Sequence, residues 1–237
     1  MEQDTKIKIL VVEDDISLKD SLVRLLQNRD FLVQAVENKH QAVEQIKSGQ
    51  QYDIYLLDVW LPDGNGFDIC HEIRKISQAI VMFLTSCDDE ESITKGLDIG
   101  GDDYITKPFN PLELVARVKS QLRRYTQLGN MNQQAEGQVY KCGGLQINDD
   151  NKEVTVDGDP IKLTPIEYNI LLLLVKNAGK VFSIDEIYEK IWNEEAIGAD
   201  NTVAVHIRHI REKIEINPRE PKYLKVVWGV GYKIEKQ

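Results

Sequence analysis

The sequence predicts an α/β domain built on a doubly wound parallel sheet, followed by a smaller α+β domain. Two observations support this prediction. Within residues 1–125, short apolar runs alternate five times with segments that repeat apolar residues at helical spacing. Beyond a polar stretch over residues 126–138, the pattern changes to short strands, three helices and a final pair of strands. We therefore expect residues 1–125 and 139–237 to fold as separate domains joined by a flexible linker.

The first domain is expected to contain a five-stranded sheet, because its predicted strands are almost continuously apolar and would be buried on both faces. The strands are KIKILVV (6–12), FLVQAV (31–36), YDIYLLDV (52–59), AIVMFLT (79–85) and DYIT (103–106). Predicted helices follow them over residues 17–27, 40–49, 66–76, 90–100 and 110–124. Such sheets bind ligands outside the carboxyl ends of their strands.

The second domain is predicted from turn and capping signals. Asp149-Asp150 and Asp157-Gly158 mark hairpin turns. The segments Thr164–Glu167 and Ser183–Glu186 match the capping box that begins a helix. A third helix is expected next, and two final strands turn at Gly229-Val230-Gly231. Three helices followed by a terminal hairpin are typical of a winged helix-turn-helix domain.

Composition and charge narrow the classes of function. The net charge of −10 argues against a generally basic nucleic-acid-binding protein, but the charge is uneven. Residues 1–125 hold 22 acidic and 15 basic residues, whereas residues 201–237 hold 4 acidic and 8 basic ones. No apolar run has the length of a membrane span, and the N-terminus lacks a signal-peptide pattern. The three cysteines have no CxxC spacing, which indicates free thiols and a cytoplasmic protein.

Polar residues gather at the predicted carboxyl ends of four strands. In chain order they are Glu13-Asp14-Asp15, Asp58, Thr85-Ser86 and Lys107-Pro108. A single acid at a strand end is more often a helix cap or a turn residue. Because the carboxyl ends of parallel strands meet at one edge of a sheet, four such groups together favour a ligand site.

The residue types at this edge indicate phosphoryl chemistry. Clustered carboxylates repel each other unless a cation joins them, and their oxygen atoms favour Mg²⁺ or Mn²⁺. Asp58 could attack phosphorus and form an aspartyl phosphate. The ammonium group of Lys107 would then offset charge on the phosphoryl oxygens, and Thr85 could donate a hydrogen bond to them.

Residues 6–125 resemble the receiver domain of response regulators, which has a flavodoxin-like fold. The matching stretches are VVEDD (11–15), LLDVWLPDGNG (56–66), FLTS (83–86) and DDYITKPF (102–109). The resemblance implies a phosphoacceptor, Asp58, and a metal site made by Glu13, Asp14, Asp58 and the backbone carbonyl of Trp60. It also implies a phosphoryl-binding and switch group made by Thr85, Tyr104 and Lys107. The Lys107–Pro108 peptide would be cis.

Two residues depart from the pattern of this family. Ser86 stands beside the expected phosphorylation site, where alanine is usual, and is expected to change the lifetime of the phosphate. Gly101 also stands where alanine is usual, and is expected to loosen the turn from helix to strand.

The predicted helix from Asn201 to about Glu215 has one apolar stripe, made by Val203, Ile207, Ile210 and Ile214. A polar opposite face is usually only solvated surface. Here the helix is the third of its unit, lies in the basic part of the chain and precedes a hairpin, which favours insertion into the major groove of DNA.

Residues 140–237 resemble the winged-helix effector domain of the OmpR/PhoB family. The matching stretches are LTPIEYNILLLL (163–174), NTVAVHIRHIREKI (201–214) and VVWGVGYKI (226–234). The resemblance implies DNA contacts by Thr202, Arg208, His209, Arg211 and Lys213. We expect Arg208 and His209 at base edges and the other three at phosphates. In the terminal hairpin, Trp228 is expected to pack either on a DNA sugar or on the domain core.

Together the two resemblances imply an OmpR/PhoB-family two-component response regulator. A partner histidine kinase would phosphorylate Asp58 with Mg²⁺, after which the receivers would dimerise and the effector domains would bind tandem half-sites on double-stranded DNA. RNA polymerase is a further candidate partner. No P-loop is present, so direct use of ATP is not expected and the protein is not a classical enzyme, although autodephosphorylation is compatible with the site. Candidate residues of the dimer interface are Asp98, Asp102, Asp103, Arg117, Arg123 and Arg124.

Two alternatives use the same acidic residues. A phosphatase of the haloacid-dehalogenase type also has a nucleophilic aspartate at a strand end, but it needs a second aspartate two positions on, where this chain has Trp60. A phosphorylation-independent DNA-binding protein would keep the acidic pocket for structure alone. The substitution Asp58→Asn separates this second alternative from a switch, because only a switch would lose phosphate-dependent dimerisation.

Overall fold

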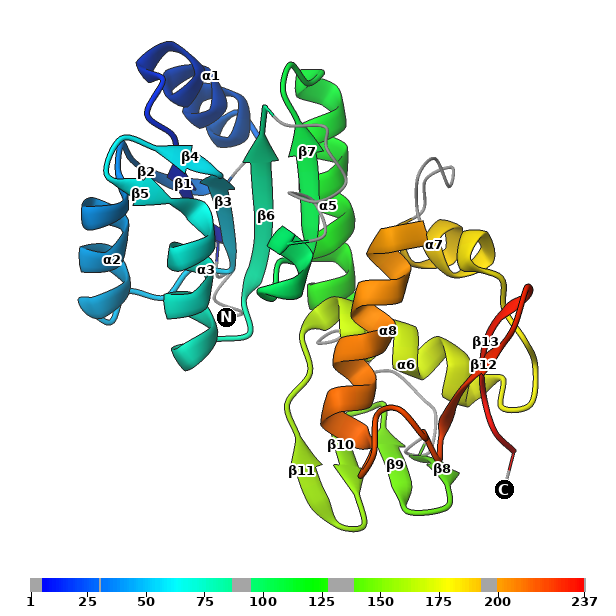
Figure 1. Cartoon of the computed structure of the whole chain (residues 1–237). Coiled ribbons are helices and arrows are strands. Elements are labelled where there is room, and N and C mark those ends of the chain that lie inside the picture. Colours follow the sequence, from blue (N-terminus) through cyan, green and yellow to red (C-terminus); the bar gives the residue numbers. More distant parts are fainter. Residues whose placement is uncertain (1–5, 30, 87–94, 128–138, 193–199, 237) are drawn as a thin grey trace. The chain divides into compact units, whose positions relative to one another are not determined.

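The computed structural model describes the chain except residues 1–5, 30, 87–94, 128–138, 193–199 and 237 (Figure 1). The chain divides into two compact units, Met1–Ala116 and Arg117–Gln237, which are described in turn. The division falls inside α5 (Pro111–Gln127), close to the predicted end of the first domain. Most of the predicted linker lies outside the described residues, so its flexibility and the domain limits stay predictions.

The first unit contains a five-stranded parallel sheet, which confirms the predicted fold class. Its strands, in spatial order, are β2 (Leu32–Val36), β1 (Lys8–Val12), β3 (Ile54–Asp58), β6 (Ile80–Thr85) and β7 (Asp103–Thr106). Every neighbouring pair is parallel. The central strands β1, β3 and β6 are buried along almost their whole length, because apolar residues fill both of their faces.

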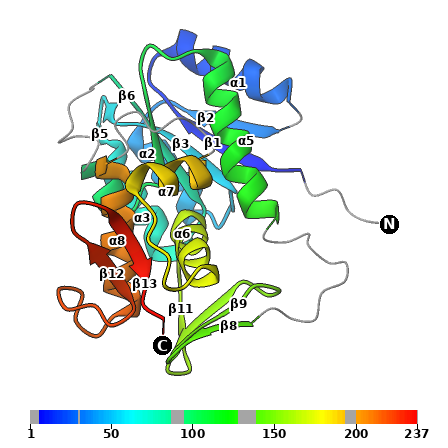
Figure 2. The same ribbon diagram turned by 90° about the vertical axis from the view of Figure 1, so that its right-hand side faces the viewer.

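Helices cover both faces of this sheet. α2 and α3 lie on one face, and α1 and the start of α5 lie on the other (Figure 1 and Figure 2). Their bounds are Ile16–Gln27 for α1, Lys39–Lys47 for α2 and Gly66–Ile76 for α3. Each of these three helices has an N-cap residue whose side-chain oxygen accepts a hydrogen bond from a backbone N–H of the first turn. These N-cap residues are Asp15 for α1, Asn38 for α2 and Asn65 for α3. The cap at Asp15 explains why this acid follows Glu13 and Asp14 in the sequence.

One part of the first unit was not predicted from the sequence, and one predicted helix lies partly outside the described residues. After Asp58 the chain forms a short hairpin of β4 (Trp60–Leu61) with β5 (Gly64–Asn65). Strands of two residues are too short for a periodic pattern to reveal. The predicted helix over residues 90–100 is described only from residue 95, and residues 95–98 are helical.

Gly101 leaves room for the ring of Phe83 on β6. A Cβ atom at Gly101 would lie 2.5 Å from Cε2 of Phe83 and 3.0 Å from the carbonyl oxygen of Gly96. Phe83 is 2% exposed and packs edge-on against Phe67, with 5.2 Å between the ring centroids. Glycine is therefore needed at position 101 because a larger residue would collide with the Phe83 ring, whereas the sequence suggested only a looser turn.

The substitution Gly101→Ala is expected to lower the free energy of unfolding of the first unit by about 1–3 kcal/mol, because the added methyl group overpacks the Phe83 ring. Adding Phe83→Leu should recover part of this loss, since the smaller side chain vacates the space. Urea unfolding of the wild type, both single variants and the double variant measures the coupling. Strictly additive effects of the two substitutions would contradict this packing account.

Among its described residues, the second unit contains the end of α5, a four-stranded antiparallel sheet, three further helices and a terminal hairpin (Figure 1). The sheet contains β8 (Val139–Cys142), β9 (Leu145–Asn148), β10 (Glu153–Val156) and β11 (Asp159–Ile161). The helices are α6 (Pro165–Lys176), α7 (Ile184–Trp192) and α8 (Asp200–Ile214). The hairpin pairs β12 (Leu224–Val227) with β13 (Gly231–Ile234). The predicted winged helix-turn-helix arrangement is confirmed.

Local signals in the sequence account for these elements. Both predicted capping boxes are formed, at Thr164 with Glu167 and at Ser183 with Glu186. The β10–β11 turn at Asp157-Gly158 has positive φ at both residues, which suits a two-residue hairpin loop. One core joins the sheet, the three helices and the hairpin. In the part of the chain that the structure describes, no helix combines the length and the apolar character needed to cross a membrane.

Candidate functional site

The carboxyl edge of the five-stranded sheet brings four predicted groups together. Asp58 ends β3, Glu13 follows β1, Thr85 ends β6 and Lys107 follows β7. Glu13, Asp58 and Thr85 are 1%, 5% and 3% exposed. A buried carboxylate is costly unless it is paired, so two of them at one edge require a positive partner.

Lys107 supplies this positive charge. Its Nζ lies 2.6 Å from Oε2 of Glu13 and 2.7 Å from Oδ2 of Asp58. The Lys107–Pro108 peptide is cis, as the resemblance implied. One ammonium group thus holds two carboxylates that come from strands far apart in the sequence.

Burial and the close contacts at this edge shift the pKa values of Glu13 and Lys107. Burial raises the pKa of Glu13 to about 7, and the charge of Asp58 adds to this effect, whereas the hydrogen bond from Lys107 opposes it. Burial alone would lower the pKa of Lys107, but its hydrogen bonds to Asp58 and Glu13 raise it above the ordinary value. The ammonium group therefore stays charged, and further positive charge beside Glu13 would favour its ionised form.

The acidic residues fit a divalent cation. Glu13, Asp14 and Asp58 each offer a carboxylate oxygen, and these atoms lie within 4.8 Å of one another. Asp14 is exposed, so one side of the cluster is open to solvent. Carboxylate oxygens with open positions for water and phosphate are the ligands that Mg²⁺ prefers. The backbone N–H of Trp60 donates to Oδ1 of Asp58 at 3.1 Å, which keeps the Trp60 peptide beside the acidic cluster.

Asp63 anchors the loop that carries Trp60, a role that the sequence analysis missed. Its two carboxylate oxygens accept the backbone N–H groups of Lys39 and His40, each at 2.8 Å, at the start of α2. At the other end of the loop, a Cβ atom at Gly66 would lie 2.3 Å from the carbonyl oxygen of Asp58. The LPDG turn was visible in the sequence, but its contact with α2 depends on the fold.

The predicted switch residues occupy neighbouring strands. Thr85 lies one residue beyond Leu84, which pairs in register with Asp58. Tyr104 on β7 is opposite Phe83 on β6, is partly buried and packs against the core of the unit. Ser86 is exposed beside Thr85. The arrangement provides a hydroxyl group near Asp58 and an aromatic ring on the adjacent strand.

Asp102, one of the candidate dimer residues, is buried inside the first unit. It is 0% exposed, and its Oδ2 accepts from Nη2 of Arg74 at 2.7 Å and from the backbone N–H of Val81 at 2.9 Å. Asp103 is also buried, whereas Asp98 is exposed and Arg117 is partly buried. The side chains of Arg123 and Arg124 lie outside the described residues. A dimer interface therefore stays a prediction, and Asp102 has a structural role.

Helix α8 buries the predicted apolar stripe, from Val203 to Ile214, at 0–2% exposure. Arg208 is exposed, as expected for a residue that faces DNA. His209 and Thr202 differ from the expectation, because they are only 8% and 2% exposed. Helical periodicity gives the direction of a side chain but not the elements that pack beside it, so the burial of these flanking residues could not be predicted.

Two basic residues of α8 are bound within the second unit. Nε of Arg211 donates to the carbonyl oxygen of Leu224 at 3.0 Å, and its guanidinium lies over the ring of Tyr232 at 5.9 Å. Nζ of Lys213 lies 2.8 Å and 2.5 Å from the two carboxylate oxygens of Glu167. Arg211 and Lys213 therefore connect α8 to the hairpin and to α6, and their phosphate contacts stay predictions.

The sequence left two positions open for Trp228, on a DNA sugar or on the domain core. Trp228 is 87% exposed at the tip of the β12–β13 hairpin, so packing on the domain core is wrong. The next two residues complete the tip, with Gly229 at φ +73° and Val230 at 55% exposure. The hairpin thus presents an exposed indole ring.

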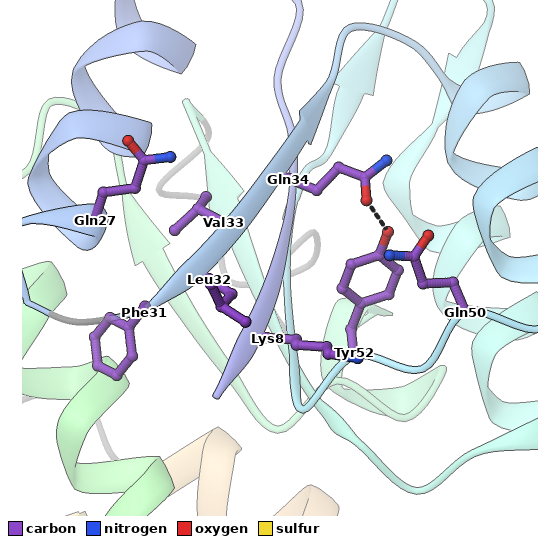
Figure 3. Close-up of a pocket in the computed structure, with 8 residues that line it drawn as sticks. All are labelled: Lys8, Gln27, Phe31, Leu32, Val33, Gln34, Gln50 and Tyr52. Carbon is purple, nitrogen blue, oxygen red and sulfur yellow. Dashed lines mark hydrogen bonds between the residues drawn. The ribbon is translucent and has the colours of Figure 1, made fainter. Parts of the chain in front are cut away.

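A separate groove of about 330 Å³ lies beside the edge strand β2 (Figure 3). Its lining includes Phe31, Leu32, Gln34 and Tyr52, and the Tyr52 hydroxyl donates to Oε1 of Gln34 at 2.6 Å. Leu32 and Lys8, which also lines the groove, begin their strands. The groove therefore lies at the amino ends of the strands, away from Asp58.

Known proteins resemble the chain along its whole length. Two family models match it, the response regulator receiver domain over residues 9–119 and the C-terminal domain of transcriptional regulatory proteins over residues 158–234. The regulatory proteins VanR of Enterococcus faecium and VanRc of Enterococcus gallinarum are 42% and 41% identical, each over 97% of this chain and 99% of its own. Among solved structures, the response regulator DrrB, a Thermotoga maritima OmpR/PhoB homologue, is 35% identical, with a TM-score of 0.52, and covers 97% of this chain and 99% of its own.

Proposed function

Because the chain belongs to the OmpR/PhoB family of two-component response regulators, we propose that phosphorylation of Asp58 by a histidine kinase controls its binding to DNA. The chain joins a receiver domain to a transcriptional regulatory domain, so it is a regulator of transcription. The observation that carries the proposal is the buried group formed by Glu13, Asp58 and Lys107 at the carboxyl edge of the sheet.

Asp58 would act as the nucleophile. One of its carboxylate oxygens attacks the phosphorus atom of a phosphohistidine on the kinase, the new P–O bond forms, and the P–N bond breaks with the imidazole as leaving group. Mg²⁺ held by Glu13, Asp14, Asp58 and the Trp60 carbonyl would supply positive charge to the phosphoryl oxygens. Lys107, which contacts Asp58 before the reaction, can pair with these oxygens afterwards.

The phosphorylated receiver would then favour a symmetric dimer. Thr85 would donate its hydroxyl hydrogen to the phosphoryl group, and Tyr104 would turn further into the core beside Phe83. The exposed Asp98 is a candidate for the dimer surface, with Arg117 as a candidate partner. Dimerisation would raise the effective concentration of two DNA-binding domains at tandem half-sites. RNA polymerase is a further proposed partner, and the bacterial cytoplasm, where DNA is found, is the proposed place of action.

In the second unit, Arg208 is the proposed base-reading residue. Its side chain is exposed on α8, the helix that the fold offers to the major groove, whereas the side chains of Arg211 and Lys213 are directed to the hairpin and to α6. Thr202 and His209 flank it on the same helix. Arg208 can approach a guanine edge with two parallel hydrogen bonds.

Intact mass measurement after treatment with acetyl phosphate and Mg²⁺ tests the phosphorylation. We expect the wild type and the control variant Asp68→Asn to gain one phosphoryl group and Asp58→Asn to gain none. Asp68 is a suitable control because it is an exposed acid on α3, outside the acidic cluster. A phosphoryl group retained by Asp58→Asn would identify a different acceptor and contradict the proposal.

Size exclusion and DNA-binding measurements on the same samples test whether phosphorylation promotes dimerisation and DNA binding. The phosphorylated wild type should elute as a dimer and bind DNA more tightly than the untreated protein. Beryllium fluoride with Mg²⁺ replaces acetyl phosphate if the phosphate is short-lived. A protein whose size and DNA affinity are the same in the presence and absence of beryllium fluoride would be a phosphorylation-independent DNA-binding protein.

A further inference from the structure

Glu167 is a buried acid at the start of α6 that contacts helix α8. Its side chain is 2% exposed. Its two oxygens lie 2.8 Å and 2.5 Å from Nζ of Lys213, near the end of α8. One of them also accepts the backbone N–H of Thr164 at 2.8 Å, within the capping box of α6. A buried, charge-assisted pair of this kind restricts how α8 can shift against α6.

His209 lies between Glu167 and Arg208. Its Nε2 is 3.2 Å from Nη2 of Arg208, and its Nδ1 is 3.9 Å from Oε1 of Glu167. Burial lowers the pKa of His209, which favours the neutral ring. A guanidinium group only donates hydrogen bonds, so Nε2 must accept and Nδ1 must carry the hydrogen. This N–H faces the Glu167 carboxylate, whose negative charge favours the same tautomer.

Arg208 is held between two neighbours on the exposed side of α8. Its Nη2 contacts His209, and its Nε lies 3.6 Å from Oε1 of Glu212. The side chains of Arg208 and Glu212 are 50% and 52% exposed, and exposed pairs of this kind are weak because water screens them. The contact with the buried His209 ring is therefore the more rigid support for the guanidinium group.

We propose that Glu167, held in place by Lys213, is a positioning residue for DNA recognition that acts through His209 on the direction of Arg208. The inference rests on the proposed DNA-binding function and deepens it. Glu167 itself lies inside the unit and does not touch DNA. Lys213 then fixes the position of the Glu167 carboxylate, and His209 transmits that position to the proposed base-reading residue Arg208.

The test compares sequence discrimination in full-length variants activated with beryllium fluoride. The wild type first selects a duplex from a randomised pool, and the measured quantity is the ratio of its affinities for this duplex and for a scrambled duplex. Arg208→Ala should lower the ratio about tenfold, the loss expected for one base contact. Glu167→Gln should lower it to a similar extent, yet have no further effect in the Arg208→Ala background. Glutamine keeps an acceptor for Thr164, so the capping box can still form.

Glu215→Gln is the matched control. Glu215 is another buried acid, directly after α8, but it accepts the backbone N–H groups of Lys222, Tyr223 and Leu224 and has no contact with Arg208 among the described residues. It should lower stability and leave the ratio unchanged. His209→Phe provides a second variant if Glu167→Gln does not fold, and should also lose about tenfold only when Arg208 is present.

The outcomes separate this inference from the proposed function. A wild type that selects no duplex would overturn both. A wild type that selects a duplex, together with a Glu167→Gln variant that keeps the ratio, would overturn the inference alone. An equal loss from Glu167→Gln with and without Arg208, or an equal loss from Glu215→Gln, would show a purely structural role and also overturn it.

Discussion

Replacing Lys107 by methionine is expected to slow the phosphorylation of Asp58 by about 10²–10³-fold, the loss typical when one group that stabilises transition-state charge is removed. The reason lies in two short contacts, 2.6 Å to Glu13 and 2.7 Å to Asp58. Methionine keeps the length of the side chain but offers no charge to these buried carboxylates or to the incoming phosphoryl oxygens. A time course of intact mass with acetyl phosphate and Mg²⁺ measures the rate.

The same variant should become more dependent on Mg²⁺ for stability. Without Lys107, repulsion between Glu13 and Asp58 is relieved by a bound cation or by a proton on Glu13. At a pH above the pKa of Glu13, Mg²⁺ should therefore raise the free energy of unfolding of Lys107→Met more than that of the wild type. Lys119→Met is the control, because Lys119 is exposed on α5 and does not belong to the acidic cluster. If Lys107→Met is phosphorylated at a rate within about threefold of the wild-type rate, at equal Mg²⁺ concentration, this account of the site is refuted.

The second large effect is expected at Arg74. Arg74→Met should lower the free energy of unfolding of the first unit by about 3–5 kcal/mol, because it leaves the buried carboxylate of Asp102 without its charged partner. Arg74 also donates from Nε to the carbonyl oxygen of Gly100 at 2.8 Å and from Nη1 to that of Ala79 at 2.6 Å. One guanidinium group thus joins the end of α3 to the loop before β7 and to the start of β6.

Urea unfolding of the full-length protein measures the loss, and the next residue gives the control. Lys75 forms an exposed pair with Glu72, three residues away on α3, and such pairs contribute little to stability because water screens them. Lys75→Met should therefore change stability little. Adding Asp102→Asn to Arg74→Met should recover part of the loss, since it removes the buried charge that Arg74 no longer offsets. Similar effects of Arg74→Met and Lys75→Met would refute the role assigned to the buried pair.

The features that the sequence predicted correctly depend on residues close together in the chain, whereas the features that it missed depend on contacts between distant residues. The five strands of the parallel sheet, both capping boxes and the apolar stripe of α8 were predicted from patterns that extend over four to fifteen residues. The acidic site was predicted from a rule of topology, because parallel strands bring their carboxyl ends to one edge. That rule joined Glu13, Asp58 and Lys107 without any measured distance.

The contacts that the sequence analysis missed connect residues far apart in the chain. Arg74 meets Asp102 across 28 residues, Lys39 meets Asp63 across 24, and Glu167 meets Lys213 across 46. Each of these charged residues looks like ordinary surface in its own segment. The burial of Asp102, taken for a dimer residue, and of His209, taken for a free DNA-facing residue, follows from the same cause.

The sequence by itself determined the fold class, the family and the position of the proposed phosphoacceptor, since each depends on local periodicity or on the order of elements along the chain. The tertiary structure decided which charged residues support that framework. It placed Arg74 on Asp102, the ring of Phe83 in the space beside Gly101, and Glu167 on Lys213. Side-chain period gives the face on which a residue lies, whereas its partner depends on the element that packs against that face, which is known only once the chain is folded.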